Sequence, residues 1–257
     1  MPIPRQHSRP WSALRDCLDA PCMDGVAPAL RPLRDLDAFP PVRELDARLG
    51  DLFPRREGGR YRLVEDRGVR PRRAPPQPVS ERYDVVIDAR GEIPTRSGNW
   101  HDLFNALVWA SFPRAKSRLS ARQRRLHEDR ARRGDDRNAR TRGQDALALL
   151  DEGGALSLCA PGDLDAFTRE LIDRPLAEMV REGRARVLLF GHAALEHLVH
   201  GDGVRAAVIP LAVRGPWGAL DDVRARADLA LAEALDDDDA FAGPPPWPAA
   251  PVGLTGV

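Results

Sequence analysis

Cysteine, aromatic residues and lysine are all scarce in this chain. Three of its 257 residues are cysteines, aromatic residues make up 5%, and Lys116 is the only lysine beside 38 arginines. Cys17, Cys22 and Cys159 cannot all pair with one another and lack a second metal-type pair, so we expect buried or free thiols. The arginine bias is typical of genome composition and does not by itself indicate phosphate binding.

Long apolar runs are also missing. No segment approaches the roughly 20 apolar residues of a membrane span, and residues 1–16 lack the apolar run of a signal peptide. We therefore expect a soluble, cytoplasmic protein. The sequence has no Gly-rich phosphate loop, no nucleophile elbow and no Cys-x-x-Cys, so ATPase, Rossmann, serine-hydrolase and thioredoxin-like interpretations lack their signatures.

The zero net charge results from two regions of opposite sign. Residues 55–142 contain 23 basic and 12 acidic residues, whereas residues 143–257 contain 9 basic and 19 acidic residues. This asymmetry has two explanations: an electropositive face for an anionic partner, or two regions that attract each other within the fold.

Composition and length predict a globular protein with uneven order. Hydrophobic residues make up 42% and charged residues 30%, while 24 prolines indicate long irregular stretches. One large domain and a main domain with an appended N-terminal segment are both compatible with this length. We predict an irregular or helical segment over residues 1–80, a main mixed domain over 81–235, and an acidic, Pro-rich, solvated tail over 236–257 in which Trp247 can dock.

Periodicity predicts an α/β or α+β domain of short strands and packed helices. Asn99 and Asp102 offer helix-start chemistry for a helix that Pro113 stops or kinks. Gly153 and Gly154 are typical of a hairpin turn between two short apolar runs. The predicted strands are 83–89, 146–150, 155–159, 186–190 and 207–213, and the predicted helices are 42–53, 99–112, 164–181 with a break at Pro175, 192–199 and 220–235. A Pro/Arg linker is predicted over 70–79, and a mobile loop over the second half of the basic segment 114–142.

The helix over residues 99–112 carries the first candidate site. It is apolar almost all the way round, so it must be buried, and burial of His101 and Asn105 requires hydrogen-bond partners or a metal. These two residues lie one turn apart on one face, and with Asp102 they are the candidate catalytic residues. The alternative is structural: Asn99 and Asp102 cap the helix while His101 and Asn105 bond to neighbouring backbone.

A second candidate site, for a divalent metal, lies on the helix predicted over 192–199, which begins directly after a strand and a glycine. His192 and Glu196 are also one turn apart, and a His-Glu pair can bind a divalent metal or act as an oriented base. His197 and His200 do not complete a zincin pattern, so a further carboxylate is needed. We predict Asp145 as that ligand, with Asp151 and Glu152 also available, whereas the alternative is a surface pair. His127, a lone histidine among arginines, is expected to be exposed.

Five strings within residues 83–213 together resemble a bacterial family called domain of unknown function 3025. They are Gly91 to Arg96, Asn99 to Trp109, Phe112 to Lys116, Asp145 to Glu152, and Phe190 to Glu196. The resemblance implies a soluble bacterial protein and carries no established activity.

Three hypotheses follow from the sequence. The first is a hydrolase, metal-assisted and acting on a phosphate-containing substrate, in which the two helices converge on one cleft. The second is a non-enzymatic module that binds nucleic acid or an acidic protein through residues 114–142. The third is a structural role in which the buried polar residues only pin the core.

Overall fold

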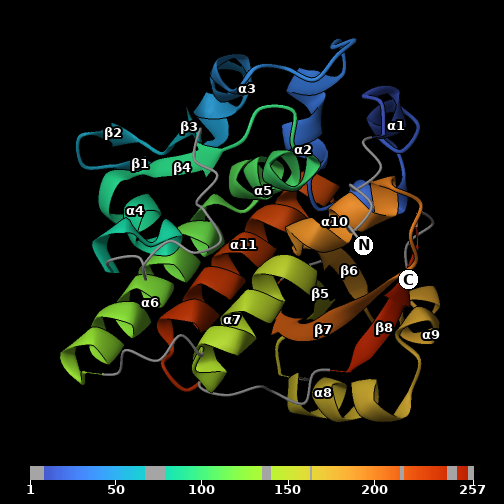
Figure 1. Cartoon of the computed structure of the whole chain (residues 1–257). Coiled ribbons are helices and arrows are strands. Elements are labelled where there is room, and N and C mark those ends of the chain that lie inside the picture. Colours follow the sequence, from blue (N-terminus) through green and yellow to red (C-terminus); the bar gives the residue numbers. More distant parts are fainter. Residues whose placement is uncertain are drawn as a thin grey trace, which may run out of the picture.

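The computed structural model describes residues 9–66, 79–134, 140–162, 164–214, 217–241 and 248–253. It has an α+β fold in which helices surround one four-stranded sheet (Figure 1). No helix within these ranges is long and apolar enough to cross a membrane.

The main sheet has the strand order β6-β5-β7-β8. β5 (Gly154–Cys159) lies parallel to β7 (Val204–Ala212) and antiparallel to β6 (Arg186–Leu189). Every residue of β5 is buried, as expected for a central strand covered on both faces. The predicted strands at 155–159, 186–190 and 207–213 are therefore confirmed.

Two small ladders lie near the end of the N-terminal segment, and the second of them connects this segment to the rest of the protein. β1 (Arg55–Arg56) pairs with β2 (Gly59–Arg60), and β3 (Arg62–Glu65) lies parallel to β4 (Glu92–Thr95). β4 leads directly into the apolar helix predicted over 99–112, so this ladder fixes the entry to that helix.

The helices pack on both faces of the sheet, with α6 and α11 side by side and α10 in contact with α5 and α7 (Figure 1). They are α1 (Ser12–Arg15), α2 (Ala27–Leu30), α3 (Val42–Leu49), α4 (Tyr83–Arg90), α5 (Trp100–Ser111), α6 (Pro113–Arg132), α7 (Arg142–Gly153), α8 (Leu164–Asp173), α9 (Leu176–Arg181), α10 (His192–Val199) and α11 (Leu220–Asp236). Short 3₁₀ turns lie at η1 (Pro21–Met23), η2 (Arg31–Leu33), η3 (Gly50–Leu52) and η4 (Val79–Glu81).

One hydrophobic core joins the two ends of the chain. Trp11, Leu30, Trp109, Leu156 and Val252 belong to the same buried cluster. The N-terminal segment therefore packs onto the main domain through shared core residues. The cysteines are confirmed as buried free thiols, and burial raises the pKa of Cys17 and of Cys22 to about 11.

The predicted strand over 83–89 is wrong, because these residues form α4. Gly91 ends this helix in the left-handed region with φ +68°, and its N–H donates to the carbonyl of Ile87. The β-branched run favoured a strand, but packing of α4 against α6 outweighs this weak preference.

The predicted strand over 146–150 and the hairpin around residues 151–154 are also wrong, because residues 146–150 lie within a helix. Thr141 and Gln144 form a capping box that starts α7, which runs to Gly153 and passes directly into β5. Neither Gly153 nor Gly154 has a positive φ, so these glycines do not form the turn that was expected.

Two further predictions need correction. Residues 249–252 of the predicted solvated tail form β8 (Ala249–Val252), an edge strand paired antiparallel with β7, whereas Trp247 lies outside the described residues. The basic segment continues as helix α6 to Arg132, and residues 135–139 of its predicted loop lie outside the described residues. The break at Gly134 is confirmed by its φ of +65°.

Candidate metal centre

The start of α5 is held by two side chains. Asn99 caps the helix by accepting from the backbone N–H of Asp102 at 3.0 Å, as predicted. The Asp102 carboxylate in turn accepts from the backbone N–H of Arg96 at 2.6 Å and from its guanidinium at 2.8 Å. This clamp fixes the first turn of α5, which carries His101.

Gly191 brings the start of α10 against the end of α7. Its N–H and that of Phe190 both donate to the carbonyl of Gly154, at 2.8 and 3.0 Å. A Cβ at position 191 would lie 2.5 to 2.7 Å from backbone atoms of residues 152–154, so only glycine fits this approach. The next residue, His192, is thereby placed beside Glu152, the penultimate residue of α7.

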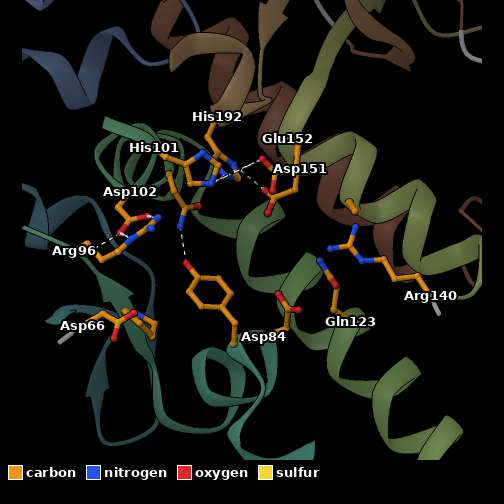
Figure 2. Close-up of a pocket in the computed structure, with 14 residues that line it drawn as sticks. Asp66, Asp84, Arg96, His101, Asp102, Gln123, Arg140, Asp151, Glu152 and His192 are labelled. Carbon is orange, nitrogen blue, oxygen red and sulfur yellow. Dashed lines mark hydrogen bonds and ion pairs between the residues drawn. The ribbon is translucent and has the colours of Figure 1, made fainter. Parts of the chain in front are cut away.

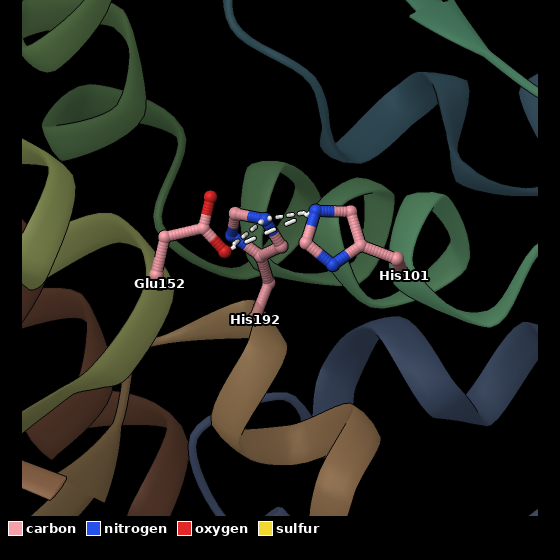
Figure 3. A group of neighbouring side chains, drawn as sticks. All are labelled: His101, Glu152 and His192. Carbon is pink, nitrogen blue, oxygen red and sulfur yellow. Dashed lines mark hydrogen bonds and ion pairs between the residues drawn. The ribbon is translucent and has the colours of Figure 1, made fainter. Parts of the chain in front are cut away.

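His101, His192 and Glu152 direct three ligand atoms to one point, as Figure 3 shows. The two imidazole Nε2 atoms are 3.0 Å apart. The Glu152 Oε2 atom lies 3.4 Å from Nε2 of His192 and 3.9 Å from Nε2 of His101. These side chains come from three helices, α5, α10 and α7, so the convergence is produced by the tertiary fold.

Each imidazole faces a carboxylate on its opposite side. Nδ1 of His101 lies 3.1 Å from Oε2 of Glu196, and Nδ1 of His192 lies 3.7 Å from Oδ1 of Asp151. A carboxylate behind a ligating histidine holds the proton on Nδ1 and leaves Nε2 as the metal-facing atom. Glu196 therefore favours this tautomer in His101, whereas the 3.7 Å between Asp151 and Nδ1 of His192 is longer than a hydrogen bond.

Two neutral rings can form both hydrogen bonds, the one between the Nε2 atoms and the one to Glu196, but they leave one imidazole nitrogen without a partner. A bond between the two Nε2 atoms needs a proton on one of them, and a neutral ring with that proton has a bare Nδ1 facing a carboxylate. Nδ1 of His192 is in fact buried without a hydrogen-bond partner. Two positively charged species resolve the conflict: an additional proton on His101, or a divalent cation between the Nε2 atoms.

The proton on His101 is itself stabilised by its surroundings. The hydrogen bond to Glu196 raises the pKa of His101 above its usual 6.5, against the opposing effect of burial, and the charge of Glu152 adds to the increase. A metal at this point must therefore displace a proton that the protein holds more firmly than usual.

A buried lysine supports the carboxylate behind His192. Lys116 is 3% exposed, and its ammonium donates to Oδ1 of Asp151 at 2.5 Å and to Oδ1 of Asn105 at 2.9 Å. Burial would raise the pKa of Asp151, but Lys116 and His192 together hold it well below its usual 3.8. Asp151 is thus a fixed carboxylate, and Asn105 donates its amide to the hydroxyl of Tyr83 at 2.7 Å.

These side chains line a pocket of about 470 Å³, shown in Figure 2. His101, His192 and Glu152 lie at its wall, and Tyr83 of α4 also lines it. The remaining lining residues are Asp66, Asp84, Pro94, Arg96, Asp102, Asn105, Gln123, Arg140, Ala148 and Asp151. The candidate ligands therefore have access to solvent and to a small molecule.

The structure brings together most of the residues predicted to form a site. His101 and His192 converge in one cleft, and Asn105 lines the same pocket. Glu196 lies behind His101, and Asp102 is engaged by Arg96. Asp145 is exposed in the first turn of α7 and does not line the pocket, and Glu152 is the carboxylate beside the two imidazoles.

The structure differs from the sequence-based expectations at His127, Tyr83 and Lys116. The predicted exposure of His127 is wrong, because its ring is 13% exposed and its Nδ1 accepts from Arg82 and Gln144. The roles of Tyr83 and Lys116 were not predicted. The available signal for Lys116 was that the chain's only lysine lies one helical turn after Phe112.

Comparison with known families gives one match. The family described as a protein of unknown function (DUF3025) matches residues 69–257. The chain belongs to this family. Membership confirms the resemblance drawn from the sequence, and the matched range includes all of the candidate ligands. No curated protein matches the chain, and no solved structure matches it.

Proposed function

We propose that this DUF3025 protein is a metal-assisted hydrolase with its metal held by His101, His192 and Glu152. The observation that carries the proposal is the convergence of both Nε2 atoms and a carboxylate oxygen on one point, with a carboxylate behind each ring. A ligating histidine nearly always has its other ring nitrogen hydrogen-bonded to such a group. Glu196 lies at hydrogen-bond distance from His101, 3.1 Å, and Asp151 lies 3.7 Å from His192.

The distances suit a small divalent cation. Ligand atoms about 2.0–2.2 Å from a tetrahedral zinc lie about 3.3 Å from one another. The separations here are 3.0, 3.4 and 3.9 Å. The longest involves Glu152, whose side chain is 51% exposed and free to adjust its rotamer.

Two histidines and one glutamate are a donor set of catalytic zinc sites, which keep a position open for water. A metal in such a site lowers the pKa of its bound water to about 7 and polarises a carbonyl or phosphoryl oxygen. The chain's own residues supply the rest: Glu196 and Asp151 orient the imidazoles, and Lys116 holds Asp151 in place.

The charge of the pocket bears on the substrate. Its lining contains five carboxylates, from Asp66, Asp84, Asp102, Asp151 and Glu152, but only two guanidinium groups. Lys116, which pairs with Asp151, and a bound divalent cation would bring the sum of these charges to about zero. The pocket then has no positive excess that would favour a multiply charged phosphate over an uncharged carbonyl compound. An ester or amide substrate therefore has more support than the phosphate-containing substrate suggested by the sequence.

The alternative function, binding of an anionic partner through residues 114–142, has less support. Lys116, Arg118, Arg124 and Arg132 of this segment all pair with carboxylates of the same chain. Arg122 donates to backbone carbonyls at the end of α11. These contacts favour internal neutralisation as the reason for the charge asymmetry. Cytoplasmic location and bacterial origin stay predictions.

Hydrolysis by metal-replete protein tests the proposal. We expect turnover of a chromogenic carboxylic ester or anilide that is lost on chelation, restored by zinc, abolished in Glu152→Ala and kept in Asp145→Ala. Asp145 is the matched control because it is an exposed carboxylate on the same helix. Faster turnover of a phosphomonoester would favour the phosphate substrate, whereas no turnover of any compound, or dependence on iron and oxygen, would contradict a hydrolase.

A further inference from the structure

Tyr83 places a phenol hydroxyl in the pocket with its proton uncommitted. The hydroxyl oxygen accepts from Nδ2 of Asn105 at 2.7 Å. Within the described residues the hydroxyl has no acceptor for its own proton, although Tyr83 lines the pocket that contains the candidate ligands. A phenol that accepts one hydrogen bond still has one to donate.

The direction of this hydrogen bond is fixed by Lys116. An ammonium group can only donate, so the Asn105 atom at 2.9 Å from it must be the carbonyl oxygen. The amide NH₂ of Asn105 therefore faces Tyr83, and the phenol oxygen must accept. A flipped amide would place its NH₂ against the buried ammonium, so the phenol oxygen accepts from Asn105 and its O–H stays available to donate into the pocket.

Tyr83 is tied through Asn105 to α5, the helix that carries the candidate ligand His101. Asn105 lies one turn after His101 on α5, so both side chains leave the same face of that helix. Lys116 joins Asn105 to Asp151, the residue adjacent to Glu152. The chain from Lys116 through Asn105 to Tyr83 thereby fixes the donor relative to the proposed metal.

We propose that Tyr83 is a catalytic residue that donates a hydrogen bond to the substrate oxygen on which negative charge develops. This inference rests on the proposed metal-assisted hydrolysis, since the charge arises when water adds to the carbonyl group. Preorganised donors of this kind act where water is partly excluded and are worth about 100- to 1000-fold in kcat. Lys116 and Asn105 are positioning residues that act through Tyr83.

A monoanion that binds the metal through one oxygen provides the test. The protein is loaded with Co²⁺, acetate is titrated, and the visible spectrum of the cobalt centre reports its dissociation constant. We expect Tyr83→Phe to weaken acetate binding about ten-fold or more while leaving the affinity for Co²⁺ within two-fold, because a hydrogen bond to a charged group is lost.

Two further variants separate the donor role from a structural one. Asn105→Asp keeps the shape of the side chain but turns the phenol proton towards the new carboxylate, so it should weaken acetate at least as much as Tyr83→Phe, with the added negative charge contributing. The double variant should bind acetate no more weakly than Asn105→Asp alone. Tyr61→Phe is the control, since Tyr61 is the chain's other tyrosine and its hydroxyl contacts Ser117 away from this pocket.

The outcomes distinguish this inference from the proposed function. Equal acetate affinity in wild type and Tyr83→Phe would overturn the role of Tyr83 while the metal site stands. A parallel loss of Co²⁺ affinity in Tyr83→Phe would show a structural role and overturn it as well. Wild-type protein without a cobalt spectrum at saturating Co²⁺ would overturn the metal site and this inference together.

Discussion

The ammonium of Lys116 is a buried charge beside the candidate site. It is stabilised by Asp151, by Asn105 and by the ring of Trp109, whose centroid is 5.5 Å from Nζ. Removal of one partner from a buried ion pair leaves the other charge uncompensated. Loss of one partner of the Lys116–Asp151 pair should therefore cost more stability than the net attraction of the intact pair contributes.

We expect Lys116→Met to lower the free energy of unfolding by about 3–5 kcal/mol at pH 7, measured by urea denaturation. The lowered pKa of Asp151 contributes stability above pH about 4 that is lost as the pH falls through that pKa. The variant lacks this contribution, so its deficit should shrink on acidification.

Arg118→Met is the matched control, because this residue is on the same helix and its ion pair with Asp236 is about half exposed. Its loss should cost less than about 1 kcal/mol. A Lys116→Met deficit that stays constant from pH 7 to pH 3 would contradict the assigned charge of Asp151.

Metal affinity should depend on pH through His101. Its pKa is raised by Glu196, so protonated His101 stabilises the metal-free fold at low pH, and this contribution is lost as the pH rises through the raised pKa. Zinc needs the neutral ring, and its affinity should therefore fall as the pH drops through that same pKa.

Glu196→Gln separates the two effects. We expect zinc affinity at pH 8 to fall about 10- to 100-fold, since the orienting carboxylate is lost, and the decline at low pH to begin at a lower pH than in wild type. Calorimetric titration from pH 6 to pH 8 measures both. Asp202→Asn, which removes the exposed partner of His197, is the control and should change neither.

At the scale of elements, the contact between Gly191 and the end of α7 determines whether His192 reaches Glu152. Gly191→Ala should lower the free energy of unfolding by about 1–3 kcal/mol and weaken zinc binding, because the added Cβ meets backbone atoms at 2.5 to 2.7 Å. Gly203→Ala, with nothing within 4 Å of an added Cβ, is the control for thermal unfolding and metal titration. Equal effects of the two variants would contradict this account.

Local signals in the sequence predicted the elements unevenly. Asn99 and Pro113 bounded the helix that carries His101 because capping and proline chemistry act within one turn. The run at 85–87 wrongly predicted a strand. The β preference of its side chains is outweighed by the packing of α4 against α6, which the sequence does not display. The Thr141 to Gln144 capping box was present in the sequence, and it would have corrected the hairpin.

The wrong hairpin prediction also explains why Asp145 and not Glu152 was predicted as the carboxylate ligand. In a hairpin Glu152 would lie in an exposed turn, and Asp145 was chosen instead. In the structure Glu152 occupies the last turn of a helix whose end abuts Gly191. The convergence of His101 and His192 was predicted as a hypothesis, whereas the ligand between them depends on where α7 ends.

At the scale of the whole molecule, the N-terminal segment and the family domain share one core. Leu30 is completely buried in the cluster that contains residues of α5, α10 and the sheet. We expect Leu30→Ala to lower the free energy of unfolding by about 2–5 kcal/mol in a single transition. Leu229→Ala, at a position 45% exposed, should cost far less.

Circular dichroism and tryptophan fluorescence measure this transition independently. Their curves should coincide for wild type and for both variants. A separate early transition in Leu30→Ala, with the remainder unfolding as in wild type, would contradict a shared core.

The metal content of protein purified without chelator tests the central claim most directly. We predict one zinc per chain in wild type and in Asp145→Ala, and loss of at least 90% of it in His101→Ala, His192→Ala and Glu152→Ala variants that remain folded. Wild-type protein that contains no metal and binds no divalent cation in titration would contradict the account.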